Sequence, residues 1–223
     1  MHPRRSLGRR RRGPCTGARK LPGMLRNPAL SVDDIIVEPR PTTKRRRASE
    51  ETQALLGLSQ VMAHAPEHAV QRLVETAMQL TEADSAGISL EDTHEGQPVF
   101  RWVAAAGEFS RYLHATMPRD FSPCGIVVTR GKTLVMRDLV RFYPYAADFH
   151  LPLHSAMLTP YGRGGKLVGT VWVLNHDARK EFDTDDVRVV GQMTTFATSI
   201  LDALQMRGGR GKGKGSTQVV PKR

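Results

Sequence analysis

Cys124 stands in the most distinctive segment of the chain, because residues 118–125 read Pro-Arg-Asp-Phe-Ser-Pro-Cys-Gly. Since it follows Pro123, we expect Cys124 in the first turn of a short helix, where the helix dipole and free amides would lower the pKa of its thiol. Gly125 would leave room for a ligand or an oxidant to approach. The alternative is a small buried packing residue, as free cysteines often are. The segment therefore predicts either a sensing thiol or a structural one.

Charged side chains and histidines near this segment give two further hypotheses. Arg119 and Asp120 either bind a charged ligand or pair with each other and hold the loop. His150 and His154 have the spacing of a helical metal pair, but Pro152 between them disfavours a helix and no cysteine or carboxylate motif completes a site. We therefore predict no metal site. No nucleophile elbow or triad spacing is present either, so we predict no enzyme.

Aromatic residues are the remaining candidates for a ligand site. Each is either part of a pocket wall or an ordinary core residue, since large aromatics pack in cores. Together with His154, the residues that we assign to the pocket wall are Trp102, Phe121, Tyr143, Tyr145, Tyr161 and Trp172. The sequence does not name the ligand or a cofactor.

Secondary-structure signals indicate what positions these residues. Helical spacing or a helix start predicts helices over residues 49–62, 66–82 and 183–206 and a short one after Pro123. Short apolar runs predict strands over residues 85–90, 98–105, 133–136, 155–161 and 167–174. In the second strand we expect Phe100, Trp102 and Ala104 on one face. Glycines between residues 162 and 165 predict a hairpin, and the side chain of Asp183 or Thr184 is expected to cap the last helix.

Charge is divided unevenly along the 223 residues, which carry a formal net charge of +11. Residues 1–47 hold fourteen basic and three acidic side chains, and residues 205–223 hold six basic and none acidic, which leaves the part between them at −6. We therefore predict a disordered basic tail over 1–47, one domain over 48–206 and a disordered glycine-rich tail over 207–223. With two cysteines, no membrane-length apolar run and no secretory signal, the protein is expected in the cytoplasm.

The order helix, strand, strand, irregular middle, strand, strand, helix resembles the GAF domain. Three further runs resemble GAF sequences, namely Ala-Asp-Ser-Ala-Gly at 83–87, Gly-Lys-Leu-Val-Gly-Thr-Val-Trp at 165–172 and Phe-Asp-x-x-Asp at 182–186. The Pro-Arg-Asp-Phe-x-Pro-Cys-Gly run is similar to GAF modules in front of bacterial sensor histidine kinases. This resemblance implies an α/β (α+β) fold with an antiparallel sheet of five or six strands, helices on one face and a ligand pocket on the other.

Departures from the family's patterns restrict the function. His176 and Val187 replace the Lys and Glu of cyclic-nucleotide-binding GAF domains, which argues against cyclic nucleotides. GAF-type methionine sulfoxide reductases use several cysteines, whereas this domain has only Cys124, which argues against that enzyme class. Bilin-binding GAF domains usually have His after the attachment cysteine, whereas Gly125 follows Cys124, which argues against a bilin chromophore. After Met206 no phospho-acceptor helix or ATP-binding domain follows, so we expect the signal to pass to a separate protein.

The resemblance implies a sensory protein that binds a small ligand, or senses redox state, and relays it to a histidine kinase or transcription regulator. The apolar stripes over 55–62 and 187–204 also predict a parallel homodimer through the terminal helices. The alternative is a nucleic-acid-associated protein whose basic tails bind phosphates on a structural GAF scaffold, weakly and without sequence preference.

Overall fold

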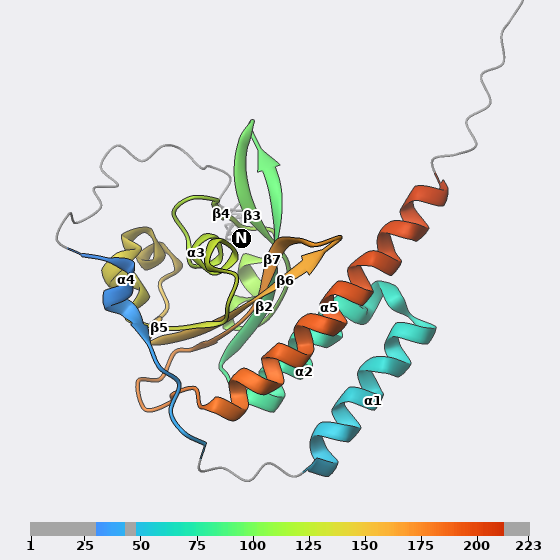
Figure 1. Ribbon diagram of the computed structural model, residues 1–223, viewed down its shortest axis with the longest axis horizontal. Coiled ribbons are helices and arrows are strands. Elements are labelled where there is room, and N and C mark those ends of the chain that lie inside the picture. Colours follow the sequence, from blue (N-terminus) through green and yellow to red (C-terminus); the bar gives the residue numbers. More distant parts are fainter. Residues whose placement is uncertain (1–29, 43–47, 212–223) are drawn as a thin grey trace, which may run out of the picture.

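A seven-stranded antiparallel sheet forms the centre of the computed structural model, which describes residues 30–42 and 48–211 (Figure 1). The strand order is β1-β5-β6-β7-β2-β3-β4. The strands are β1 (Ile36–Val37), β2 (Ser85–His94), β3 (Gln97–Gly107), β4 (Thr116–Pro118), β5 (Leu134–Arg137), β6 (Ser155–Arg163) and β7 (Lys166–Asn175). The five strands expected from the sequence are confirmed, and the two short edge strands β1 and β4 bring the number above the predicted five or six.

Three long helices cover one face of this sheet. Figure 1 shows α2 (Ala69–Thr81) and α5 (Thr184–Gly211) lying against the strands, with α1 (Ala48–His64) beside α2. The α2 helix begins after a 3-10 turn, η2 (Pro66–His68), in which Pro66 needs no backbone donor. Leu58 of α1 is fully buried in the core between the helices and the sheet.

The opposite face is covered by short helices and turns, which come mainly from the irregular middle of the chain. They are η3 (Glu108–Tyr112), α3 (Pro123–Arg130), α4 (Leu139–Phe142) and η4 (Pro144–Phe149). Their side chains form a second, aromatic-rich core against the sheet, separate from the helix-side core. The sheet thus has helices on one face and an irregular cover on the other, as expected.

A short segment before α1, residues 30–42, also packs against the domain, and we call it the N-terminal segment. It forms η1 (Val32–Ile35) and β1, which pairs with β5 through Ile36–Met136 and Val37–Val135. Ile35 is 3% exposed within the second core. The prediction of a disordered tail over 1–47 is therefore wrong for residues 30–42, and residues 1–29 and 43–47 lie outside the described residues.

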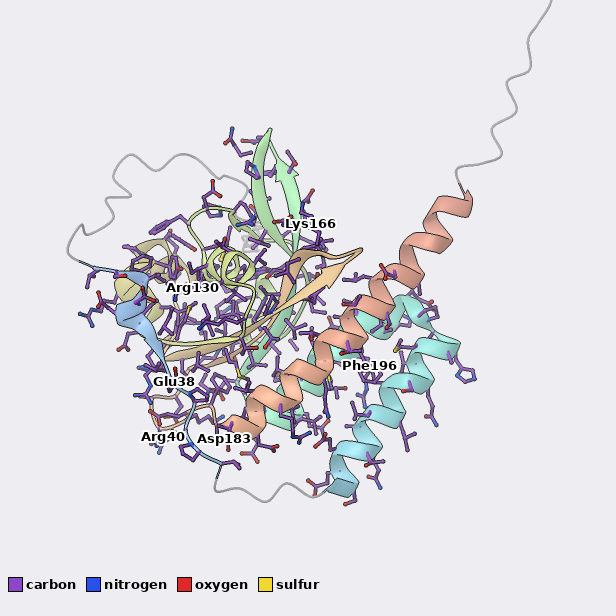
Figure 2. All side chains as sticks on the ribbon, in the orientation of Figure 1. Glu38, Arg40, Arg130, Lys166, Asp183 and Phe196 are labelled. Carbon is purple, nitrogen blue, oxygen red and sulfur yellow. The ribbon has the colours of Figure 1, made fainter. Side chains whose placement is uncertain are left out.

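The N-terminal segment contacts both the cover and the helix layer. Asp33 forms an ion pair with Arg130, the last residue of α3, at 2.7 Å. At the other end of the segment, the backbone of Arg40 donates to the carbonyl oxygen of Phe182 and accepts from the amide of Thr184. Figure 2 shows Arg40 beside Asp183, where α5 begins. One stretch of chain therefore joins α3 to the start of α5.

Helix α5 begins where the sequence predicted and ends later. Asp183 Oδ1 accepts from the amides of Asp185 and Asp186 at 2.8 and 2.9 Å, and Asp186 Oδ2 accepts from the amide of Asp183 at 2.9 Å. This reciprocal cap confirms the expected start. The helix continues through the glycines at 208 and 209 to Gly211, so the predicted tail boundary at 207 is wrong, and residues 212–223 lie outside the described part. Within that part, no helix has the length and apolar character to cross a membrane.

A β-bulge in β3 changes which residues face the cover. Ile88 pairs with Ala104, but Ser89 pairs with Trp102, so Val103 has no partner of its own on β2. Trp102 therefore faces the aromatic core while Ala104 faces the helices. The expectation that Phe100, Trp102 and Ala104 share one face is wrong for Ala104, because simple alternation does not anticipate the extra residue.

Candidate functional site

A small cavity lies between the sheet and the cover formed by α3, α4 and η4. Its volume is about 40 Å³, enough for one or a few water molecules. Its walls are almost wholly apolar and aromatic. The lining residues are Trp102, Phe109, Met117, Pro123, Cys124, Leu139, Tyr143, Tyr145, Ala146, Phe149, Leu153, Leu158 and Trp172.

Five of the residues predicted for a pocket meet at this cavity, namely Trp102, Cys124, Tyr143, Tyr145 and Trp172. They come from β3, α3, the turn between α4 and η4, η4 and β7, which are far apart in the sequence but adjacent in the fold. The cavity also depends on residues that sequence reasoning missed, above all Phe109 and Phe149. The aromatic content of the middle segment was the only available signal for them.

Ser89 links Trp172 to Cys124 through hydrogen bonds. Sequence reasoning did not single this residue out. Trp172 Nε1 donates to Ser89 Oγ at 3.1 Å, and Ser89 Oγ lies 3.1 Å from Cys124 Sγ. Thr170 Oγ1 donates to the same sulfur at 3.3 Å. Gly87 makes room for this arrangement, since a Cβ there would lie 2.1 Å from the Trp172 ring. A strand with Ser, Gly and Ser on one face was the available signal.

Cys124 is a buried thiol rather than an activated one. Its side chain is 1% exposed, and burial raises the pKa of the Cys124 thiol although hydrogen bonds from Ser89 and Thr170 act to lower it. Desolvation outweighs any effect of the helix start, so the predicted lowering of its pKa is wrong. The expected space beside Gly125 is also filled, because a Cβ there would lie 2.1 Å from the carbonyl oxygen of Arg119.

Trp102 holds the one hydrogen-bond donor at the cavity that is left unpaired among the described residues. Its side chain is 3% exposed, and its Nε1–H has no acceptor in the part of the chain that the structure describes. The indole is surrounded by rings, with Phe149 stacked at 5.3 Å and 27° and with Phe109 and Trp172 at 5.3 and 5.2 Å. A buried donor of this kind is uncommon because it loses its water partner without gaining another.

Arg119 and its neighbours lie outside the cavity. Arg119 Nε donates to Glu91 at 2.6 Å, and the guanidinium lies 5.3 Å from the centre of the Phe100 ring. Of the two alternatives for Arg119 and Asp120, the mutual pair is therefore not the one formed, and Asp120 is exposed. Arg119, Asp120 and Phe121 border an open hollow of about 430 Å³ between α3 and the N-terminal segment. This hollow adjoins the cavity through the shared wall residue Tyr143.

Tyr161 and His154 are the other two residues that the structure places elsewhere. Tyr161 lies on the helix side of the sheet, where its hydroxyl donates to the backbone oxygen of Ser89 at 3.0 Å and burial raises its pKa. His154 borders a separate open hollow with His176. Neither residue lines the cavity, so the pocket assignment is wrong for both. Within residues 30–42 and 48–211, no three His, Cys, Asp or Glu side chains form a group that could hold a metal ion.

Comparison with known families agrees with this architecture. The family model described as GAF domain matches residues 63–202. The chain belongs to the GAF domain family. No curated protein matches the sequence.

Solved structures show the same GAF fold at low sequence identity. The GAF domain of a phosphoenolpyruvate-protein phosphotransferase from Coxiella burnetii has a TM-score of 0.62 and 16% identity, covering 74% of this chain and 99% of that one. A free methionine-R-sulfoxide reductase from Neisseria meningitidis, solved with its substrate, has a TM-score of 0.58 and 16% identity, covering 77% and 99%. The chromophore-binding domain of a bacteriophytochrome from R. palustris has a TM-score of 0.60 and 13% identity, covering 77% and 66%. These similarities concern the fold.

Proposed function

We propose that this GAF domain is a non-catalytic cytoplasmic sensor that binds a small molecule in the cavity between the sheet and α3, α4 and η4. The observation that carries the proposal is a cavity with an almost wholly apolar, aromatic wall that includes the buried, unpaired Trp102 donor. Concave apolar sites with a few polar groups are typical of small-molecule binding. A bound ligand with an acceptor would form a hydrogen bond with this donor and so lower the free energy of the complex. Without such a ligand, the donor stays buried and unpaired among the described residues.

The buried state of Cys124 supports ligand binding over redox sensing. A thiol with a raised pKa holds little thiolate at neutral pH, and thiolate is the reactive form. Cys124 is also the one cysteine among the described residues, since Cys15 lies outside them. A disulfide exchange would need a second thiol nearby, so the pocket chemistry favours a non-covalent ligand and no catalytic step.

The relay to a partner would run through the sheet to the helices. In β7, Trp172 lines the cavity while Val171 and Val173 face the helix-side core. A ligand that moves Trp172 would therefore disturb the packing under α5, provided that it binds the two arrangements with different affinity. The receiving protein would be a histidine kinase or transcription regulator that contacts α1 or α5.

Native mass spectrometry of freshly purified protein tests the proposal. We expect a mass excess over the denatured chain that corresponds to one retained small molecule. Ala146→Leu, which adds bulk at the cavity wall, should lose this excess, while Tyr161→Phe on the opposite face of the sheet should keep it. Equal native and denatured masses, together with no ligand-induced change in thermal stability from a metabolite library, would refute ligand binding.

The predicted dimer is part of this proposal and has a test of its own. Leu58 is fully buried in the monomer, so Leu58→Glu would unfold the domain rather than report on a dimer. Leu56 of the same helix is 57% exposed and offers the usable position. We expect light scattering to give a dimer for the full chain and a monomer for Leu56→Glu at equal thermal stability. A monomer before the substitution would rule the dimer out.

A further inference from the structure

The charge of the cavity wall limits what the cavity accepts. All thirteen lining residues are apolar, aromatic or sulfur-containing, and the nearby charges lie outside it, where Arg119 and Lys166 each pair with Glu91. A charged ligand would therefore lose its hydration without meeting an opposite charge. The ligand should be neutral.

Hydrogen bonding in the wall specifies one polar contact. Trp172 Nε1 is already bonded to Ser89, and the Tyr145 hydroxyl donates to the carbonyl oxygen of Phe121 at 3.1 Å. Trp102 Nε1–H is the donor without an acceptor in the part of the chain described. The ligand should therefore carry a hydrogen-bond acceptor, because an acceptor would pair with the Trp102 donor. A donor on the ligand could not pair there, since the indole nitrogen only donates.

The stacked aromatic rings in the cavity wall indicate the shape of the ligand. The Trp102 indole and the Phe149 ring lie 5.3 Å apart at 27°, and Phe109 packs against both. Flat rings stacked in this way accept another flat ring with little loss of packing.

We propose that the ligand is a neutral, planar, largely apolar molecule with a single carbonyl-like acceptor, which receives the Nε1–H of Trp102. This inference rests on the proposed function and specifies the ligand class of the same cavity. Anionic ligands such as nucleotides are thereby rejected, in agreement with the replacement of the family's Lys and Glu by His176 and Val187.

The size of the cavity requires that part of its wall opens. A cavity of about 150 Å³ accepts benzene, whereas this one measures about 40 Å³. Residues 139–149, which we call the lid, supply Leu139, Tyr143, Tyr145, Ala146 and Phe149 to the wall. The lid is the part of the wall most suited to move.

The lid is bounded by two left-handed residues that are not glycine, Asp138 and His150, both with φ of 51°. Among the described residues, its backbone hydrogen bonds join lid residues to one another, to Asp138 or to His150. Two side-chain hydrogen bonds also hold the lid in place. The Tyr112 hydroxyl donates to the carbonyl oxygen of Phe149, and the Tyr145 hydroxyl donates to the carbonyl oxygen of Phe121. Rotation at the two ends would open the lid without breaking a strand.

Matched probes test the ligand class directly. Acetophenone and α-methylstyrene have nearly the same shape but only acetophenone has an acceptor, and benzoate adds a charge. Binding is followed by the two indole N–H signals in nitrogen-15 NMR spectra, which Trp102→Phe assigns, because the chain has two tryptophans. We expect acetophenone to move the Trp102 indole proton downfield and benzoate to leave both signals unchanged.

The acceptor is isolated by comparing ratios of affinities. The ratio of the α-methylstyrene Kd to the acetophenone Kd should fall by about tenfold in Trp102→Phe, since that change removes one hydrogen bond. In the control Tyr161→Phe, on the other face of the sheet, the ratio should stay within about twofold. Phe149→Ala, which opens space beside Trp102, provides a second background in which probe size does not limit binding.

Each result bears on one step of the inference. An unchanged ratio in Trp102→Phe, or a Trp102 signal that does not move at acetophenone saturation, would overturn the acceptor while the proposed sensor function stands. Benzoate binding as tightly as acetophenone would overturn neutrality. If no probe binds the wild-type chain or Phe149→Ala, the neutral planar ligand class is overturned, whereas the retained mass and the metabolite library decide separately whether the cavity binds any ligand.

Discussion

A Cβ atom on Gly125 would lie 2.1 Å from the carbonyl oxygen of Arg119, so glycine is required where α3 meets the loop before it. We expect Gly125→Ala to lower the free energy of unfolding by about 1–3 kcal/mol, because backbone must shift to admit the methyl group. Urea denaturation followed by circular dichroism measures the change.

The matched control is Gly191→Ala in α5, where no atom lies within 4 Å of the added Cβ. Alanine favours a helix over glycine, so this variant should be stabilised by up to about 1 kcal/mol. Equal stability of Gly125→Ala and wild type would show that the loop is not held as closely as the structure indicates.

The pKa of Cys124 predicts a pH dependence of stability. Burial raises this pKa in the folded state, so the folded protein keeps a proton that the unfolded chain releases above its ordinary thiol pKa of about 8.5. The stability is therefore complete below that pH and declines above it by up to about 1.4 kcal/mol per pH unit. Cys124→Ser should flatten the decline between about pH 8.5 and pH 9.5, below the ordinary tyrosine pKa.

Denaturation at several pH values measures this difference in a Cys15→Ser background, which leaves one thiol. In the same background, a thiol reagent should label Cys124 in the native protein far more slowly than in urea. Fast native labelling, or an identical pH profile for Cys124→Ser, would contradict a buried thiol with a raised pKa.

Arg119 is expected to stabilise the fold and not to bind the ligand. Its pair with Glu91 is about three-quarters buried, with each side chain 23% exposed, so Arg119→Met should cost about 0.5–1 kcal/mol after allowing for solvent screening. Acetophenone affinity should be unchanged. Arg111→Met is the control, because Arg111 and Glu108 are more than half exposed and 3.5 Å apart. A large loss of affinity in Arg119→Met would place Arg119 in the site.

The N-terminal segment is expected to stabilise the domain. Ile35→Ala should lower the free energy of unfolding by about 2–4 kcal/mol, since Ile35 is buried at the edge of the aromatic core. The exposed Glu38 in the same segment gives the control, and Glu38→Ala should change stability by less than about 0.5 kcal/mol. A chain starting at residue 48 should melt several degrees below one starting at residue 30. Equal melting temperatures would show that β1 is dispensable.

Local patterns were enough to predict most of the fold. The hairpin of β6 and β7 and the start of α5 are confirmed because their signals are local, in the turn glycines and the capping carboxylate of Asp183. The two-residue strand β1 could not be predicted, since two residues cannot show a period of two. Its place is fixed by pairing with β5, about a hundred residues later.

The candidate site was predictable in its residue types but not in its chemistry. Cys124 meets Ser89 and Thr170, which are 35 and 46 residues away, and the burial that raises its pKa outweighs the lowering by these two hydrogen bonds, so it depends on the tertiary fold. Tyr161 was assigned to the pocket because it is aromatic, and its type does not show that it lies on the helix side of the sheet. Trp102 could be proposed as a wall residue, but its unpaired donor depends on where every neighbouring acceptor lies.

The bulge at Val103 has a consequence for aligning this chain with other GAF domains. Residues on either side of it follow alternation separately, with Trp102 and Ala105 facing the cavity side and Ala104 and Ala106 facing the helices. A family member that lacks the extra residue would keep the same faces with a regular ladder. A one-residue gap at this position is therefore structurally neutral, whereas an ungapped alignment would exchange cavity and helix positions along half of the strand.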